Sequence, residues 1–124
     1  MSNEHLVRAK VLIVDDTDLV VSLLRRYLEP AGYVVGSAPD GPAGLQKFRE
    51  GSWDLVITDR VMPGMTGEEM AAEIKNADPR IPVVLITGTG SALVRRELFD
   101  AVLDKPFTLA EVLACVERVL RGHA

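Results

Sequence analysis

The chain has 124 residues, of which 48% are hydrophobic and 26% charged, and 14 basic against 18 acidic residues give a formal net charge of −4. This length suits one globular domain with its own core, and the acidic balance argues against direct nucleic-acid binding, because phosphate backbones select for clustered positive charge. The single cysteine, Cys115, excludes an intrachain disulfide and the usual zinc or iron–sulfur motifs, which favours a reducing, cytoplasmic location. No apolar run approaches the ~20 residues that a bilayer requires, so we expect no membrane insertion.

Five short apolar runs, most of them rich in β-branched residues, predict β-strands. In chain order they are Val11 to Val14, Tyr33 to Val35, Leu55 to Ile57, Val83 to Ile86 and Val102 to Leu103. The runs are continuous rather than alternating. This pattern is typical of a parallel sheet that helices cover on both faces.

The segments between these runs carry helical periodicity and helix-start signals. Asp40 is a candidate N-cap, and both Thr66 with Glu69 and Thr108 with Glu111 have the spacing of a capping box. Periodicity and caps together predict helices near 17–30, 40–50, 66–77, 91–99 and 108–121.

Strand followed by helix, five times over, predicts an α/β fold. Its commonest five-stranded form is the doubly wound, flavodoxin-like parallel sheet with strand order 2-1-3-4-5. We expect residues 1–7 to be a flexible N-terminus and residues 8–122 to form a single domain. Because only three residues follow position 121, we expect no attached DNA-binding or enzymatic output domain.

Polar residues stand where the predicted strands end. Asp15 and Asp16 follow the first strand, Asp59 the third, Thr87 the fourth, and Lys105 the fifth. In such a sheet, ligands bind beyond the carboxyl ends of the strands, between strands 1 and 3 for this order. Each residue alone has a simpler interpretation, such as a helix N-cap for Asp16 or a turn residue for Asp59. Their convergence on one edge favours a shared site.

Three carboxylates from Asp15, Asp16 and Asp59 would repel one another across neighbouring strands. A hard divalent ion that takes oxygen ligands and shares its shell with a phosphate is Mg²⁺, which typically uses one or two protein carboxylates. The remaining carboxylate could then attack phosphorus, with a lysine and a hydroxyl steadying the phosphoryl oxygens. Asp59, Lys105 and Thr87 fit these roles.

At this point the sequence resembles the receiver domain of two-component response regulators, over nearly the whole chain. The motifs that carry the resemblance are Asp15-Asp16, Asp59 followed by Met62-Pro63 and Gly67, Thr87, and Lys105-Pro106-Phe107. The resemblance implies that Asp59 is the phosphoacceptor and that Thr87 and Lys105 contact the phosphoryl group. It also implies a cis peptide bond before Pro106.

The resemblance further implies the Mg²⁺ ligands. These are the carboxylates of Asp16 and Asp59, the main-chain carbonyl of Val61, and Asp15 through a bound water. Neither Val61 nor Thr89 supplies an acid or amide that could orient an attacking water, which favours slow self-hydrolysis of the phosphoryl group.

The implied partner is a histidine kinase or phosphotransfer protein that donates a phosphoryl group from phosphohistidine. The domain would catalyse only its own phosphorylation and dephosphorylation, and would signal through the face formed by the fourth helix, fifth strand and last helix. Its target is either a downstream protein or kinase modules on the same chain, and the segments 62–67 and 87–90 resemble receivers of hybrid histidine kinases. Two features depart from the family at this face. Val102 replaces a usual aromatic residue, and only eighteen positions separate Thr87 from Lys105, which predicts a short or displaced fourth helix.

Two alternative functions stay open. The run Asp16-Thr17-Asp18-Leu19-Val20 matches the Asp-x-Asp motif of haloacid-dehalogenase-type phosphohydrolases, in which Asp16 would be the nucleophile and Asp18 the acid. Against this, the chain has no room for a substrate cap. The second alternative is a degenerate receiver that serves only as a binding module, although every residue needed for phosphoryl transfer is present.

Overall fold

The computed structural model describes residues 8–88 and 95–122 of the chain. Five strands form one parallel sheet in the order β2-β1-β3-β4-β5, which confirms the predicted strand order. The strands are β1 (Lys10–Val14), β2 (Val34–Ala38), β3 (Leu55–Asp59), β4 (Val83–Thr87) and β5 (Ala101–Asp104). The predicted flexible segment, residues 1–7, lies outside the described residues.

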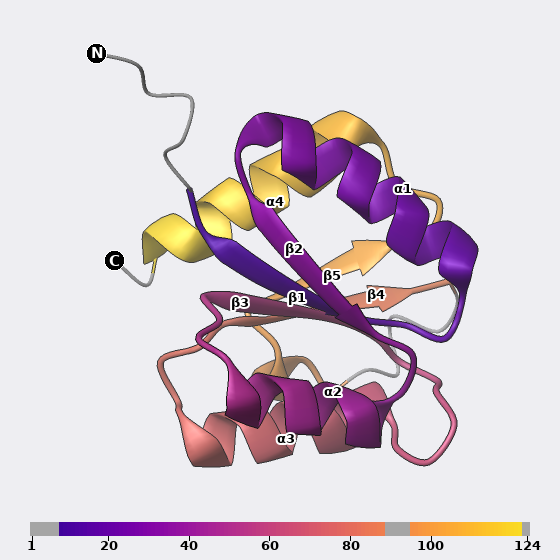
Figure 1. Cartoon of the computed structure of the whole chain (residues 1–124), viewed down its shortest axis with the longest axis vertical. Coiled ribbons are helices and arrows are strands. Elements are labelled where there is room, and N and C mark those ends of the chain that lie inside the picture. Colours follow the sequence, from indigo (N-terminus) through magenta and orange to yellow (C-terminus); the bar gives the residue numbers. More distant parts are fainter. Residues whose placement is uncertain (1–7, 89–94, 123–124) are drawn as a thin grey trace.

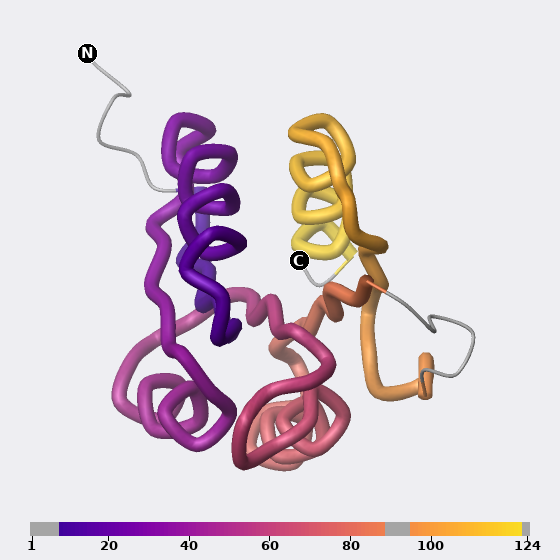
Figure 2. The backbone as a smooth tube through the Cα atoms, turned by 90° about the vertical axis from the view of Figure 1, so that its right-hand side faces the viewer, coloured from indigo at the N-terminus to yellow at the C-terminus, as the bar shows by residue number. Residues whose placement is uncertain are grey.

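Helices cover both faces of the sheet (Figure 1). Helices α1 (Asp18–Leu28) and α4 (Leu109–Gly122) lie on one face, and α2 (Gly41–Glu50) and α3 (Gly67–Ala77) lie on the other, as the turned view in Figure 2 also shows. Alternate residues of β1 therefore enter different cores: Val11 and Ile13 pack under α1 and α4, whereas Leu12 and Val14 pack toward α2 and α3. This two-sided burial explains why the predicted strands read as continuous apolar runs.

The helix starts follow the predicted caps. Asp40 Oδ1 accepts a hydrogen bond of 2.8 Å from the Ala43 N–H at the start of α2. Thr66 and Glu69 form a reciprocal capping box at the start of α3, and Thr108 and Glu111 make the same pair of bonds, 2.8 and 3.1 Å long, before α4. These bonds satisfy N–H groups that the first turn of a helix leaves unpaired.

The prediction of a helix near 91–99 is wrong for the residues of that range that the structure describes. Positions 91–94 lie outside the described residues, and 95–99 contain a single 3₁₀ turn, η3 (Arg96–Leu98). Leu98 and Phe99 pack against the core on the α2 and α3 side. The Asp100 carboxylate then accepts hydrogen bonds from Lys75 Nζ and the Val83 N–H, which fixes the start of β5 beside β4.

The first helix is also shorter than the predicted 17–30. Helix α1 ends at Leu28, and the 3₁₀ turn η1 (Glu29–Ala31) follows, with Pro30 inside it and Gly32 in the left-handed region at φ 102°. A proline at this point cannot donate the backbone hydrogen bond that would continue the α-helix. Within residues 8–88 and 95–122, no helix combines the length and apolar character that would be needed to cross a membrane.

Candidate functional site

The carboxyl ends of the strands bring the predicted site residues to one edge of the sheet. Val14 pairs with Thr58, so the residues that follow them, Asp15 and Asp59, lie on adjacent strands. One carboxylate oxygen from each of Asp15, Asp16 and Asp59 lies within 4.8 Å of the other two. The predicted acidic cluster is therefore present in the folded chain.

Asp15 is the buried member of the cluster, with 2% of its surface exposed. Its Oδ1 accepts a hydrogen bond of 2.8 Å from the Thr17 N–H, whereas its Oδ2 is buried without a hydrogen-bond partner. Burial raises the pKa of the Asp15 carboxyl, the Thr17 N–H counteracts this rise, and the neighbouring Asp59 charge adds to it. Asp15 Oδ2 is thus a buried acceptor that receives no hydrogen bond.

Asp16 does not cap the first helix, so that simpler interpretation is wrong. The N-cap of α1 is Thr17, and its side chain makes no capping hydrogen bond. Asp16 itself is exposed and belongs to the acidic cluster. Its carboxylate faces its neighbours at the site instead of the backbone of α1.

Asp59 lies between a backbone donor and a lysine. Its Oδ1 accepts a hydrogen bond of 2.8 Å from the Arg60 N–H and lies 3.5 Å from Lys105 Nζ. Lys105 Nζ also lies 3.9 Å from Asp15 Oδ2. The Lys105-Pro106 peptide bond is cis, as the resemblance implied. One cation therefore stands beside two of the three carboxylates.

Thr87 ends β4 next to this lysine. It is 3% exposed, and its carbonyl accepts a hydrogen bond of 2.8 Å from the Lys105 N–H. Val61, whose carbonyl is a predicted cation ligand, lies two residues after Asp59 with 76% of its surface exposed. The structure thus brings Thr87 and Lys105 together and places Val61 on the loop that leaves the site.

The residues present fit a divalent cation. Three carboxylates supply hard oxygen donors, which Mg²⁺ and Ca²⁺ prefer, and the single Lys105 charge does not balance three negative ones. The buried Asp15 Oδ2 has no hydrogen-bond partner and would gain from a nearby cation or its bound water. Among the described residues, Asp18 does not join this group, although it follows Asp16 by only two positions.

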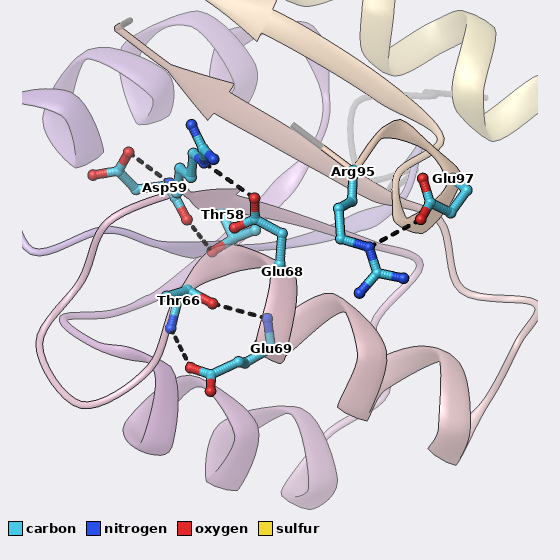
Figure 3. Close-up of polar contacts among 8 residues, drawn as sticks. Thr58, Asp59, Thr66, Glu68, Glu69, Arg95 and Glu97 are labelled. Atoms are coloured by element: carbon cyan, nitrogen blue, oxygen red, sulfur yellow. Dashed lines mark hydrogen bonds and ion pairs between the residues drawn. The ribbon is translucent and has the colours of Figure 1, made fainter. Parts of the chain in front are cut away.

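The sequence interpretation missed a half-buried ion pair beside the site. Arg60 Nε lies 3.0 Å from Glu68 Oε2, and their side chains are 26% and 17% exposed. Figure 3 shows Glu68 on α3 reaching toward the segment after Asp59, next to the Thr66 and Glu69 capping pair. The two partners are eight positions apart across a loop, so no helical or strand periodicity could have indicated their contact.

Comparisons with known proteins agree with this geometry. A family described as "Response regulator receiver domain" matches residues 11–117. The transcriptional regulatory protein ResD of Bacillus subtilis is 34% identical over 116 residues, which cover 90% of this chain and 48% of that protein. The chain spans about half the length of the curated relatives it matches.

Two solved structures are similar in both sequence and fold. The chemotaxis response regulator CheY4 of Vibrio cholerae has a TM-score of 0.83 at 32% identity, covering 90% of this chain and 98% of that one. The response regulator TrrA of Thermotoga maritima, solved in complex with Mg²⁺ and BeF, has a TM-score of 0.84 at 31% identity, with the same coverage of 90% and 98%.

Proposed function

Because the chain belongs to the family of response regulator receiver domains, which are phosphoacceptor modules of two-component signalling, we propose that it accepts a phosphoryl group on Asp59. The observation that carries this proposal is the position of the Asp59 carboxylate, which lies within the acidic cluster and 3.5 Å from Lys105 Nζ. The Lys105 charge beside Asp59 suits a carboxylate that receives a negatively charged phosphoryl group.

In the proposed reaction, an Asp59 carboxylate oxygen attacks the phosphorus of a phosphohistidine. The oxygen–phosphorus bond forms as the phosphorus–nitrogen bond breaks, and the departing imidazole takes up a proton. Lys105 then pairs with a phosphoryl oxygen, and the Thr87 hydroxyl donates a hydrogen bond to another. Asp59 keeps the Arg60 N–H as a donor that holds its carboxyl group in place.

We propose that Asp16, Asp59 and the Val61 carbonyl would hold Mg²⁺ directly and that Asp15 would do so through a bound water. When bound, the cation neutralises charge on the transferring phosphoryl group. The orphaned Asp15 Oδ2 and the clustered carboxylates support this assignment. The TrrA relative solved with Mg²⁺ and BeF supports it by analogy.

The partners follow from the same family. We propose a histidine kinase or phosphotransfer protein as donor, a cytoplasmic location, and residues 8–122 as one receiver domain that catalyses only its own phosphorylation and dephosphorylation. The relative ResD is named a transcriptional regulatory protein, so a DNA-binding output is a proposal for the whole protein rather than for this domain. That this domain is the receiver of a hybrid histidine kinase stays a prediction.

The proposed output surface is formed by β5, α4 and the segment between β4 and β5. Val102, which stands where relatives carry an aromatic residue, lies half-buried on β5. We propose that phosphorylation draws Thr87 and the segment after it toward the phosphoryl oxygens, which changes this surface. With valine at this position, the change would proceed without an aromatic ring that reorients.

The experiment that tests the function is intact-protein mass spectrometry after incubation with Mg²⁺ and a small acyl phosphate. We expect the wild-type chain to gain one phosphoryl group, and we expect neither Asp59→Asn nor a Mg²⁺-free sample to gain it. An adduct that persists in Asp59→Asn would overturn the assignment of the acceptor. Absence of any adduct in the wild-type sample, with the fold intact, would favour the degenerate receiver.

A further inference from the structure

The loop between β3 and α3 is closed by two bonds that both involve Arg60. The Arg60 carbonyl accepts a hydrogen bond of 2.7 Å from the Gly67 N–H, and Arg60 Nε donates one of 3.0 Å to Glu68 Oε2. Gly67 and Glu68 are the first two residues of α3. The loop, residues 61–66, is therefore fastened to the start of α3 by the residue that follows Asp59.

The side-chain part of this closure is shielded from water. Arg60 and Glu68 are 26% and 17% exposed, whereas the exposed pair Arg95 and Glu97 has side chains that are 66% and 65% exposed. Exposed pairs contribute little because solvent screens them and two long side chains must be ordered. The Arg60–Glu68 pair, in contrast, is only partly reached by solvent. Figure 3 shows Glu68 together with the Arg95–Glu97 pair.

The start of α3 also packs directly against the residue that we propose as phosphoacceptor. A Cβ added at Gly67 would lie 2.5 Å from the main-chain oxygen of Asp59. The position of α3 and that of the Asp59 main chain are thus coupled. Val61 lies in the loop between them; 76% of its surface is exposed, so it does not anchor the loop by packing.

We propose that Arg60 and Glu68 are positioning residues, whose ion pair holds the loop so that the Val61 carbonyl and the Asp59 carboxylate can bind one cation together. This inference rests on the proposed function. It predicts that breaking the pair weakens Mg²⁺ binding without removing any ligand. A group that orients a metal ligand in this way typically changes metal affinity by a factor of about 10 or more when it is removed.

The sharpest test is Arg60→Gln, because charge and positioning predict opposite results. The substitution removes the positive charge of the residue that follows Asp59, and the loss of a nearby positive charge would by itself tighten Mg²⁺ binding. We expect binding to weaken by about tenfold instead. The measurement is the Mg²⁺ dissociation constant obtained from the dependence of Tm on Mg²⁺ concentration, which needs no phosphoryl donor.

The matched control is Arg95→Gln, which makes the same change of residue and charge but breaks an exposed pair. We expect its dissociation constant to equal that of the wild-type protein. Arg60→Lys, which keeps the charge but loses the Nε donor, should weaken binding like Arg60→Gln, and it serves as the second variant if Arg60→Gln does not fold. The double variant Arg60→Gln with Glu68→Gln should bind no more weakly than the weaker single variant, because both changes remove one interaction.

Three results would overturn the proposal. The first is an Arg60→Gln variant that binds Mg²⁺ as tightly as the wild type or more tightly. The second is an Arg60→Lys variant that does so. The third concerns Glu68→Gln, which should bind Mg²⁺ more weakly than the wild type. If the double variant recovered wild-type binding, Glu68 would only keep the guanidinium away from the carboxylates. If the wild-type chain neither binds Mg²⁺ nor gains a phosphoryl group, the proposed function fails. If it does both and Arg60→Gln binds equally well, this inference alone fails.

Discussion

The ammonium group of Lys105 lies 3.5 Å from Oδ1 of Asp59 and 3.9 Å from Oδ2 of Asp15. Across residues 8–88 and 95–122, these are the two ion pairs in which either carboxylate takes part. Lys105 therefore supplies one positive charge beside carboxylates that would also hold a divalent cation. We expect lysine and cation to compete for these carboxylates, although both would favour a phosphoryl group on Asp59.

Replacing Lys105 by methionine should separate these two effects. We expect Lys105→Met to bind Mg²⁺ more tightly by about 1 kcal/mol, or roughly fivefold, because a nearby positive charge is removed. We also expect it to gain a phosphoryl group more slowly, because a phosphoryl oxygen loses its partner. Binding is measured from the Mg²⁺ dependence of Tm and phosphorylation from the time course of the mass shift.

Arg26→Gln is the control for this experiment, because Arg26 is exposed near the end of α1 and its removal changes net charge equally. Its Mg²⁺ affinity should stay within about twofold of the wild-type value, since exposed charges are screened. Equal affinity of Lys105→Met and wild type would contradict the idea that Lys105 competes with the cation.

The burial of Asp15 leads to a pH-dependent prediction. A pKa raised above the unfolded value means that the folded chain holds the proton more tightly than the unfolded chain. The stability that this carboxyl contributes is fully present below its ordinary pKa of 3.8 and is lost as pH rises through the raised folded-state pKa. At pH 7 without Mg²⁺, the Asp15 carboxyl therefore destabilises the fold, and Asp15→Asn should raise Tm by a few degrees.

The gain in Tm should shrink as the pH falls below about 4, where the unfolded carboxyl is also protonated. Asparagine can still accept the Thr17 hydrogen bond, so the local turn should persist. Adding Mg²⁺ should stabilise wild type more than Asp15→Asn, because the variant has one negative charge fewer at the site. Thermal melts between pH 3 and 8, with and without Mg²⁺, measure both effects. A variant that melts below wild type at pH 7 without Mg²⁺ would contradict the prediction.

Most of the fold followed from the sequence because burial on both sides of a parallel sheet leaves a strong pattern. The least accurate strand is β2, which runs over Val34–Ala38 whereas the prediction was Tyr33 to Val35. Gly36 and Ser37 have poor strand propensity, and a Cβ at Gly36 would lie 2.3 Å from the Trp53 ring. Pairing with β1, which extends from Val34 to Ala38, therefore continues this strand beyond its apolar run.

The candidate site was predicted in its residues but only partly in its geometry. Spacing placed Asp15, Asp16 and Asp59 at one edge, and the structure confirms that they meet. Spacing could not tell that Thr17, rather than Asp16, occupies the N-cap of α1, because both residue types favour that position. Nor could it reveal the Arg60–Glu68 pair, since the path of a loop depends on tertiary packing.

Asp18 distinguishes the receiver from the alternative hydrolase. Its side chain is exposed in the first turn of α1 and lies outside the acidic cluster found among the described residues. We expect Asp18→Asn to gain a phosphoryl group at a rate within about twofold of wild type. Its stability should fall by no more than about 0.5 kcal/mol, because a negative charge at a helix N-terminus is lost.

The matched variant is Asp16→Asn, which makes the same change two positions earlier. We expect it to lose most of its Mg²⁺ response and its phosphorylation, as measured by Tm shift and intact mass. Sustained hydrolysis of the acyl phosphate by wild type, abolished equally in both variants, would favour a phosphohydrolase in which Asp16 is the nucleophile and Asp18 the acid.

Gly67 links the stability of the fold to the geometry of the site. A Cβ at this position would lie 2.5 Å from the Asp59 carbonyl oxygen and 3.1 Å from Arg60 Cα, both of which are main-chain atoms. Because backbone cannot move aside as a flexible side chain can, Gly67→Ala should push α3 away from the end of β3. We expect the free energy of unfolding to fall by about 1–3 kcal/mol, which is typical of overpacking, and Mg²⁺ affinity to fall with it.

Gly122→Ala provides the control, because a Cβ at the end of α4 meets no atom within 4 Å. Alanine has the higher helix propensity, so this variant should be unchanged or more stable by up to about 1 kcal/mol. Urea unfolding measures stability, and the Mg²⁺ dependence of Tm measures affinity. If Gly67→Ala loses stability but binds Mg²⁺ as wild type does, the α3 start supports the fold without positioning Asp59. If both variants keep wild-type stability, the backbone around Asp59 has more room than the structure indicates.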